Sequence, residues 1–271
     1  MFSTTSFGER AIFLAAVCSQ TYTLFSNADG SFVVPKDYSV IHTIEAKSIT
    51  NVWERFGFII ESPQEIIIAF RGTSSTTDWI SDIIASQKRF KYINEHCLTH
   101  RGFTDIYTSA RDGIINALTK LSTDKTLTIT GHSLGGALAT LCAVDVAANT
   151  AYHSPDLYTY GSPRVGDPAF AQAFSKYVRR SFRIANLFDI VTYAPPTIYK
   201  QPKRDKKYYY SHVQTHSPLS FQNGAISLNH VIGSYFAALS QLNPEYAQRL
   251  CSTNPGFCPG IKETSRSLIQ T

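Results

Sequence analysis

The pattern of apolar and polar positions along the chain predicts an α/β protein. Residues 66–70 form an unbroken apolar run, which is typical of a strand covered on both faces. Farther along, strand-like and helix-like segments alternate, so we expect parallel βαβ units in a central, mostly parallel sheet flanked by helices. The expected strands are 38–46, 55–62, 66–70, 126–130, 157–160 and 182–188, and the expected helices are 11–18, 102–122, 134–148, 169–178 and 229–241, followed by an irregular tail.

Composition allows one large hydrophobic core. The chain has 271 residues, of which 43% are apolar and 17% charged, and this excludes disorder and fibrous repeats. No repeat, linker or low-complexity stretch divides it, so we expect one domain over residues 1–271. No apolar run approaches the roughly 18 residues of a membrane span, and no transmembrane segment is expected.

The N-terminal apolar stretch 11–18 is expected to be a helix rather than a secretory leader. Glu9 and Arg10 precede it, and no small-residue cleavage pattern follows. The compartment stays open between the cytoplasm and a processed or leaderless secreted form.

The five cysteines are an odd number, so at least one lacks a partner within the chain. Cys18 and Cys142 lie in apolar helical stretches and are expected in the core. Cys251 and Cys258 lie in the Pro/Gly-rich tail, where a local bridge and two free thiols are both compatible with the sequence.

The formal charge of +5 is modest and mostly dispersed, which argues against a nucleic-acid-binding protein. One basic cluster stands out, and it runs directly into three tyrosines. It is compatible with contact to an anionic surface or with a nuclear-import signal, but a solvated hairpin edge is favoured, because lysines on an edge strand block unwanted pairing. The cluster comprises Lys203, Arg204, Lys206 and Lys207 around Asp205.

The segment Gly131-His132-Ser133-Leu134-Gly135 has the G-x-S-x-G spacing and lies between an expected strand and an expected helix. A tight turn there would expose the Ser133 hydroxyl at the carboxyl end of the strand, and the glycines would let neighbouring backbone pass close by. The N–H of Leu134 would open the helix and point at a developing oxyanion. Ser133 is therefore the candidate nucleophile.

A serine nucleophile needs a base and a group that orients the base. Asp189 follows the strand expected at 182–188, which would bring it to the carboxyl edge of the sheet, whereas Asp167 precedes a helix and is adequately explained as a cap. His230 heads the expected helix 229–241 and is favoured as the base, with Asn229 as a candidate helix cap. The other downstream histidines are His153, His212 and His216.

Several blocks in order resemble the class 3 lipase family within the α/β-hydrolase superfamily. They are Ala69-Phe70-Arg71-Gly72-Thr73, Asp78-Trp79-Ile80-Ser81-Asp82, His100-Arg101-Gly102-Phe103, Thr130 to Ala137, Tyr160 to Gly166, and Asp189-Ile190-Val191 with Pro195-Pro196. The resemblance implies an α/β-hydrolase fold, a Ser133, His230 and Asp189 triad, and Thr73 as the oxyanion-hole residue beside Leu134. A turn threonine at the end of a strand would also explain Thr73.

The resemblance further implies a short helical lid over about 74–84, in which Trp79, Ile80 and Ile83 would cover the cleft or contact lipid. A fixed, buried Trp79 is an equally open alternative. The implied activity is triacylglycerol hydrolysis through an acyl-enzyme, with an acylglycerol or other acyl ester as substrate and a lipid-water interface as partner. A short-chain or feruloyl-type esterase, a phospholipase A1 and a catalytically silent binding protein are the alternatives. No cofactor and no metal are expected, because no phosphate-binding or dinucleotide loop occurs and no four-ligand spacing is present.

Overall fold

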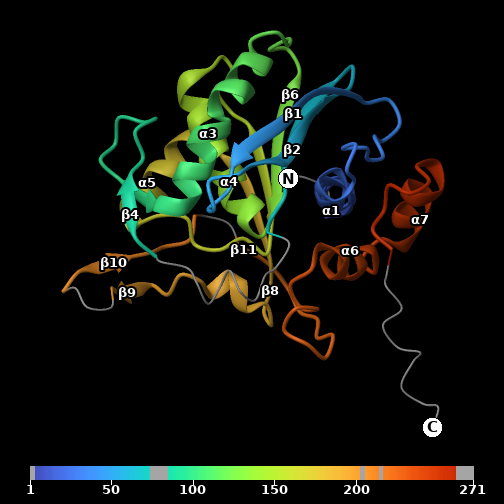
Figure 1. Ribbon diagram of the computed structural model, residues 1–271. Helices are drawn as coiled ribbons and strands as arrows, with labels where there is room; N and C mark the ends of the chain where they lie inside the picture. Colours follow the sequence, from blue (N-terminus) through green and yellow to red (C-terminus); the bar gives the residue numbers. More distant parts are fainter. Residues whose placement is uncertain (1–3, 74–84, 202–204, 214–215, 261–271) are drawn as a thin grey trace.

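In the part of the chain that the structure describes, seven strands form the central sheet. The computed structural model describes residues 4–73, 85–201, 205–213 and 216–260. The strand order is β1-β2-β3-β6-β7-β8-β11, and the sheet is parallel from β3 onward, with two antiparallel pairs at the β1 edge (Figure 1). The mostly parallel sheet expected from the sequence is confirmed. Its strands are β1 Ser39–Lys47, β2 Trp53–Glu61, β3 Glu65–Phe70, β6 Thr126–His132, β7 Asp156–Tyr160, β8 Arg180–Asn186 and β11 His216–Leu219.

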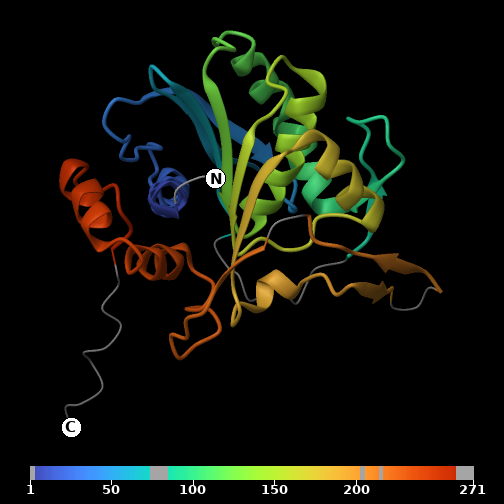
Figure 2. The same cartoon turned by 180° about the vertical axis from the view of Figure 1, so that it is seen from behind.

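Helices cover both faces of the sheet (Figures 1 and 2). One face carries α3 (Arg101–Leu118), α4 (Leu134–Asn149) and α5 (Pro168–Tyr177), and the other carries α1 (Thr4–Ser26), α6 (Ile232–Ser240) and α7 (Pro244–Thr253). The apolar run in the central strand β3 is unbroken because its side chains are buried on both faces of the sheet. Ile66 and Ile68 lie in the core cluster shared with α3 and α4, whereas Ile67 and Ala69 lie in the cluster shared with α1 and α6.

The C-terminal third differs from the expected elements. The helix expected at 229–241 begins only at Ile232, and Asn229 does not cap it, because Val231 is the cap residue and forms no side-chain cap bond. The tail expected to be irregular contains α7, whose start is stabilised by the Asn243 side chain accepting the Tyr246 N–H at 3.1 Å. The four-residue strand β11 was also not expected, because it is short and lacks a periodic apolar pattern.

Two small hairpins stand beside the main sheet. One pairs β4 (Gln87–Arg89) with β5 (Leu98–His100), and the other pairs β9 (Ile198–Lys200) with β10 (Lys207–Tyr209), between η1 (Ile190–Tyr193) and β11. The hairpin expected for the basic cluster is confirmed through β9 and β10, although Lys203 and Arg204 lie outside the described residues.

A disulfide joins Cys251 to Cys258, which decides the alternative that the sequence left open. Cys18 and Cys142 are fully buried, as expected. Among the described residues, none of the helices combines the length and apolar character that crossing a membrane requires.

Candidate active site

Ser133 is the single residue between β6 and α4, at the carboxyl edge of the sheet. Its backbone has φ 59 and ψ −129, a conformation that residues with a side chain rarely adopt. A Cβ atom on Gly131 would lie 2.1 Å from the Gly135 carbonyl oxygen, and one on Gly135 would lie 2.3 Å from that of Phe70. The sharp turn expected from the sequence is confirmed, and its glycines are needed because the backbone passes so closely.

Two backbone segments flank Ser133. A Cβ atom on Gly72 would lie 2.7 Å from the serine Cβ, so the chain leaving β3 runs directly past the serine. Thr73 is the next residue along that chain. On the other side, Leu134 begins α4, and its N–H therefore has no acceptor within the helix. The Arg71 guanidinium donates to the Gly72 carbonyl at 2.8 Å and stabilises the end of the strand. The two expected oxyanion-hole residues thus lie on segments that meet at the serine.

His230 and Asp189 are in direct contact. The His230 Nδ1 lies 2.7 Å from Asp189 Oδ2, and the two side chains are buried. The other carboxylate oxygen accepts the Val191 N–H at 3.0 Å. Because Nδ1 faces a carboxylate, it carries the proton, and Nε2 is left with a lone pair able to accept one.

Two residues that the sequence analysis did not single out complete this contact. The Tyr235 hydroxyl donates to Asp189 Oδ2 at 2.7 Å, and burial raises the pKa of that hydroxyl well above its usual value, so it remains a donor. Gly161 has φ 55, and a Cβ atom there would lie 2.7 Å from Asp189 Oδ2. Gly161 lies within the block Tyr160 to Gly166 that carries part of the family resemblance, so the sequence did offer a reason to single it out. Nothing in the local pattern distinguishes Tyr235 from a core tyrosine.

Three buried polar atoms in this region have no hydrogen-bond partner among the described residues. They are Thr73 Oγ1, Ser133 Oγ and His230 Nε2. An unpaired buried polar group costs about 1–3 kcal/mol, so such atoms mark places where a ligand is expected to bind. The serine hydroxyl and the imidazole are therefore not hydrogen-bonded to each other in this structure. Hydrogen bonds of this kind are commonly long or unaligned until substrate is bound.

His132, the residue before Ser133, connects both sides of the site. Its Nε2 lies 2.7 Å from the His230 carbonyl oxygen, and its Nδ1 lies 2.7 Å from the Tyr22 hydroxyl. The carbonyl can only accept, so Nε2 carries the proton and Tyr22 donates to Nδ1. The Tyr22 oxygen in turn accepts the Gly72 N–H at 3.0 Å. Burial lowers the pKa of His132 well below its usual value, so its imidazole stays neutral and Nδ1 can accept the Tyr22 proton.

The alternative acid and bases lie elsewhere. Asp167 caps α5 by accepting the Phe170 N–H at 2.7 Å. His212 bonds the Thr192 carbonyl at 2.7 Å, and burial lowers its pKa to about 3. His153 and His216 are exposed. The expected lid residues Trp79, Ile80 and Ile83 lie outside the described residues, so the lid stays a prediction.

Known proteins resemble this chain in sequence and fold. A model of the family "Lipase (class 3)" matches residues 67–199. A lipase of Rhizomucor miehei is 35% identical over 145 residues, which are 51% of this chain and 40% of the lipase. Phospholipase A1-II 7 of Oryza sativa subsp. indica is 31% identical over 172 residues, covering 50% of this chain and 42% of that protein.

The solved structures include a triacylglycerol lipase described as having a serine protease triad at its catalytic centre. It is 26% identical, with a TM-score of 0.62 over 72% of this chain and 76% of that one. This chain spans less than half the length of the two sequence relatives above. The family match nonetheless includes the turn at Ser133 as well as Asp189, and the fold agrees with it. Over residues 67–199, which are just under half of its length, the chain matches the class 3 lipase family.

Proposed function

We propose that this protein is a serine carboxylic-ester hydrolase that cleaves acylglycerols. The observation that carries the proposal is the strained backbone at Ser133, which projects an unpaired hydroxyl into a buried region that also holds the His230 and Asp189 pair. Backbone strain of this kind costs about 1–3 kcal/mol and persists where the surrounding structure enforces it. Here the strained turn is explained if Ser133 is a nucleophile, because this turn projects its side chain from the edge of the sheet.

Each proposed residue has a chemical role in acyl transfer. His230 Nε2 accepts the proton of the Ser133 hydroxyl as its oxygen attacks the ester carbonyl carbon, and Asp189 stabilises the imidazolium that forms. The N–H groups of Leu134 and Thr73, with the Thr73 hydroxyl, would donate to the oxyanion of the tetrahedral intermediate. Collapse of that intermediate expels the alcohol, which takes the proton from His230. Water then attacks the acyl-enzyme by the same route and releases the acid.

The relatives support two substrate classes with the same chemistry. Among similar proteins are the Rhizomucor miehei lipase and a secreted mono- and diacylglycerol lipase of Fusarium solani, and these favour acylglycerols. The similar proteins also include phospholipases A1 from plants, which keep a phospholipid substrate as the second candidate. A short-chain or feruloyl-type esterase remains the third.

Hydrolysis of an emulsified long-chain triglyceride, measured beside a soluble short-chain ester and a diacyl phospholipid, tests this proposal. We expect turnover of the triglyceride, and we expect Ser133→Ala to abolish turnover of every ester. Ser162→Ala is the matched control, because Ser162 is also buried near this turn but, among the described residues, its hydroxyl bonds only the neighbouring carbonyl of Pro163. Unchanged hydrolysis by the Ser133→Ala protein would refute the proposal, and a preference for the phospholipid would redirect it to the second candidate.

A further inference from the structure

Two arginines near the proposed active site lack an acidic partner. Arg164 follows β7 and Arg183 lies in β8. Both side chains are half-buried, and neither forms an ion pair with a carboxylate in the part of the chain that the structure describes. Partly or fully buried charges are normally paired. Three other arginines that are half-buried or buried do pair in this way: Arg10 with Glu65, Arg71 with Glu54 and Arg111 with Asp145.

These two arginines also have nitrogens without hydrogen-bond acceptors. In each of them Nε is buried and has no partner among the described residues. The end of the Arg164 side chain is fixed, because Nη1 donates to the carbonyl oxygens of Tyr193 and Pro195, the second at 2.8 Å. Arg183 donates to no described residue, and of its side-chain nitrogens only Nε is buried, so the terminal nitrogens are open to a ligand from solvent. Charged donors without acceptors mark a place where an anion is expected to bind.

Two imidazoles, rather than carboxylates, lie beside the arginines. His216 pairs with Arg183 in the parallel register of β11 and β8, so the two side chains share one face of the sheet. Burial and, after it, the charge of Arg183 lower the pKa of His216, and they lower the pKa of His212 to about 3. Burial and the charge of Arg164 likewise lower the pKa of Arg183. The two guanidinium charges thus lie close enough to repel each other.

The arginines and the proposed active site share the short helix η1. Asp189 stabilises the start of η1 by accepting the Val191 N–H at 3.0 Å. His212 Nε2 bonds the Thr192 carbonyl at 2.7 Å, and the Thr192 hydroxyl donates to the Asp189 carbonyl at 2.8 Å. Arg164 binds the carbonyl of Tyr193, the last residue of η1. A ligand on the arginines would therefore lie beside the segment that carries Asp189.

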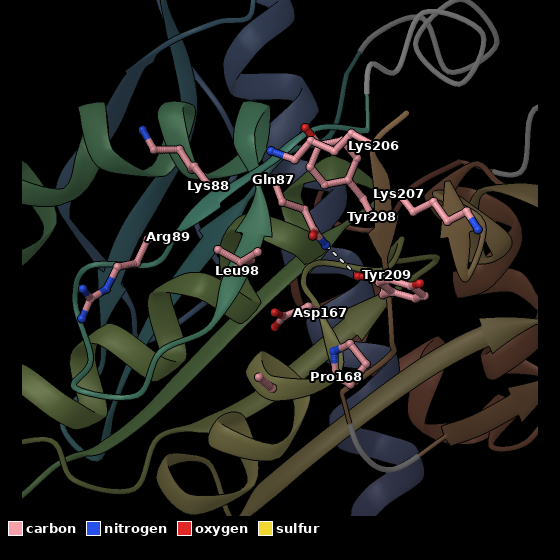
Figure 3. A pocket seen from close by; sticks show the side chains of 11 residues that line it. Gln87, Lys88, Arg89, Leu98, Asp167, Pro168, Lys206, Lys207, Tyr208 and Tyr209 are labelled. Atoms are coloured by element: carbon pink, nitrogen blue, oxygen red, sulfur yellow. Dashed lines mark hydrogen bonds between the residues drawn. The ribbon is translucent and has the colours of Figure 1, made fainter. Parts of the chain in front are cut away.

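A second basic region is less suited to an anion. Figure 3 shows a pocket of about 590 Å³ that is lined by Lys88, Lys206 and Lys207. Lys88 already pairs with Asp105 at 2.6 Å. Lys206 and Lys207 extend in opposite directions from β10, so their charges do not converge on one ligand (Figure 3). The arginines are favoured over this pocket because their charges are close together and unpaired.

We propose that Arg164 and Arg183 together bind a phosphate group. The planar donors of a guanidinium match the spacing of phosphate oxygens, and the negative charge of the phosphate offsets the two cations. Two sources share this chemistry, namely free inorganic phosphate and the headgroup of a phospholipid. The inference goes beyond the proposed function, because binding a phosphate does not require that Ser133 hydrolyse an ester.

Thermal unfolding of the full chain tests the proposal, with Ser133→Ala as the background so that added esters stay intact. About 10 mM inorganic phosphate is compared with sodium chloride of equal ionic strength. With a dissociation constant of about 1 mM, phosphate should raise the melting temperature by about 4 °C. Arg183→Met keeps the length of the side chain and removes the guanidinium, and it should reduce this shift to below about 1 °C.

The matched control is Arg180→Gln, which removes the same charge from the same strand. Arg180 already pairs with Asp156 at 3.2 Å, so the phosphate shift should stay within about 1 °C of the background value. A second measurement follows His216 by NMR in the background protein. Phosphate should raise its pKa, because a bound anion offsets the charge of Arg183 that helps to lower it. No phosphate shift in the background protein, an equal shift in Arg183→Met, or an unchanged pKa of His216 would overturn the proposal.

Short-chain lipids separate the two sources. Monomeric dihexanoyl phosphatidylglycerol is compared with dihexanoylglycerol in the same unfolding experiment. If the phosphate belongs to a headgroup, the phospholipid should raise the melting temperature more than the neutral lipid does, and Arg183→Met should remove that difference. If the ligand is free phosphate, the two lipids should act alike while inorganic phosphate still stabilises the protein. None of these outcomes depends on ester hydrolysis, so a failure here is distinguishable from a failure of the proposed function.

Discussion

Replacing Tyr22 by Phe tests whether the chain of bonds through His132 positions the oxyanion hole. The substitution keeps the ring and removes only the hydroxyl, which donates to His132 Nδ1 at 2.7 Å and accepts the Gly72 N–H at 3.0 Å. Gly72 precedes Thr73, so the donors of Thr73 lose an anchor one residue away. The substitution does not touch Ser133, His230 or Asp189 directly.

The expected size of the effect follows from the two lost bonds. A hydrogen bond between neutral groups contributes about 1 kcal/mol, so the loss of two such bonds should lower the free energy of unfolding by at most about 2 kcal/mol. We expect somewhat less than this, because Tyr22 is only partly buried. Complete loss of an oxyanion donor costs about 10²-fold or more in kcat. A displaced donor should cost less, and we expect kcat to fall roughly tenfold while KM stays within about twofold.

Steady-state hydrolysis of a soluble short-chain ester, together with urea denaturation, measures these two effects. Tyr38→Phe is the control. The Tyr38 hydroxyl bonds Glu65, which begins β3, whereas Gly72 follows the other end of β3, beside Ser133. The control should lose stability and retain kcat. If Tyr22→Phe matched the control in both measurements, the hydroxyl would have only a structural role, and the reasoning about positioning would be wrong.

Four further outcomes are expected. Asp189→Asn should lower kcat by about 10⁴-fold with little change in melting temperature, measured on the same ester, because the imidazole would no longer be held with its proton on Nδ1. Asp145→Ala should lower the free energy of unfolding in urea by about 3–5 kcal/mol, since it leaves a guanidinium and a phenol without the buried carboxylate that they bind. Burial lowers the pKa of His100 to about 4, so below about pH 6.5 the unfolded chain binds a proton at this residue that the native protein does not. His100 should therefore contribute about 2 kcal/mol to the fall in stability by pH 5, beside the contributions of the buried His132 and His212, and His100→Gln should make the fall in a denaturation series smaller by about that amount. The Cys251→Ser/Cys258→Ser variant should be less stable by about 2.5 kcal/mol in thermal or urea unfolding, and reductant should have no further effect on it.

The parts of the fold that sequence analysis predicted share a strong local signal. The strand at 66–70 is marked by an apolar run that only a doubly covered strand requires, and the structure has β3 there. The turn at Ser133 is marked by glycines that the close backbone contacts require. β11 was missed because it is four residues long, carries no comparable pattern and is stabilised by its pairing with β8. α7 was missed although its start carries a local signal, with Asn243 as the cap residue and Pro244 directly after it.

The candidate site divides in the same way. Ser133 and Leu134 follow from their spacing, because the turn that presents them is local. The choice of Asp189 over Asp167 rested on which strand end each residue follows, and the contact between Asp189 and His230 spans 41 positions. Tyr235 and Tyr22 could not be assigned at all, since tyrosines are frequent in this chain and their roles arise from bonds to residues far away in the sequence.

The sequence by itself determined the elements whose formation depends on neighbours in the chain: the parallel strands, the helices between them and the glycine turn that presents the Ser133 hydroxyl. Only the tertiary structure decided which imidazole meets which carboxylate and that His132 links the two sides of the site. The physical reason is that local conformation depends on steric and periodic preferences within a few residues, whereas buried hydrogen bonds and surface charge depend on which distant segments the packing of the sheet brings together.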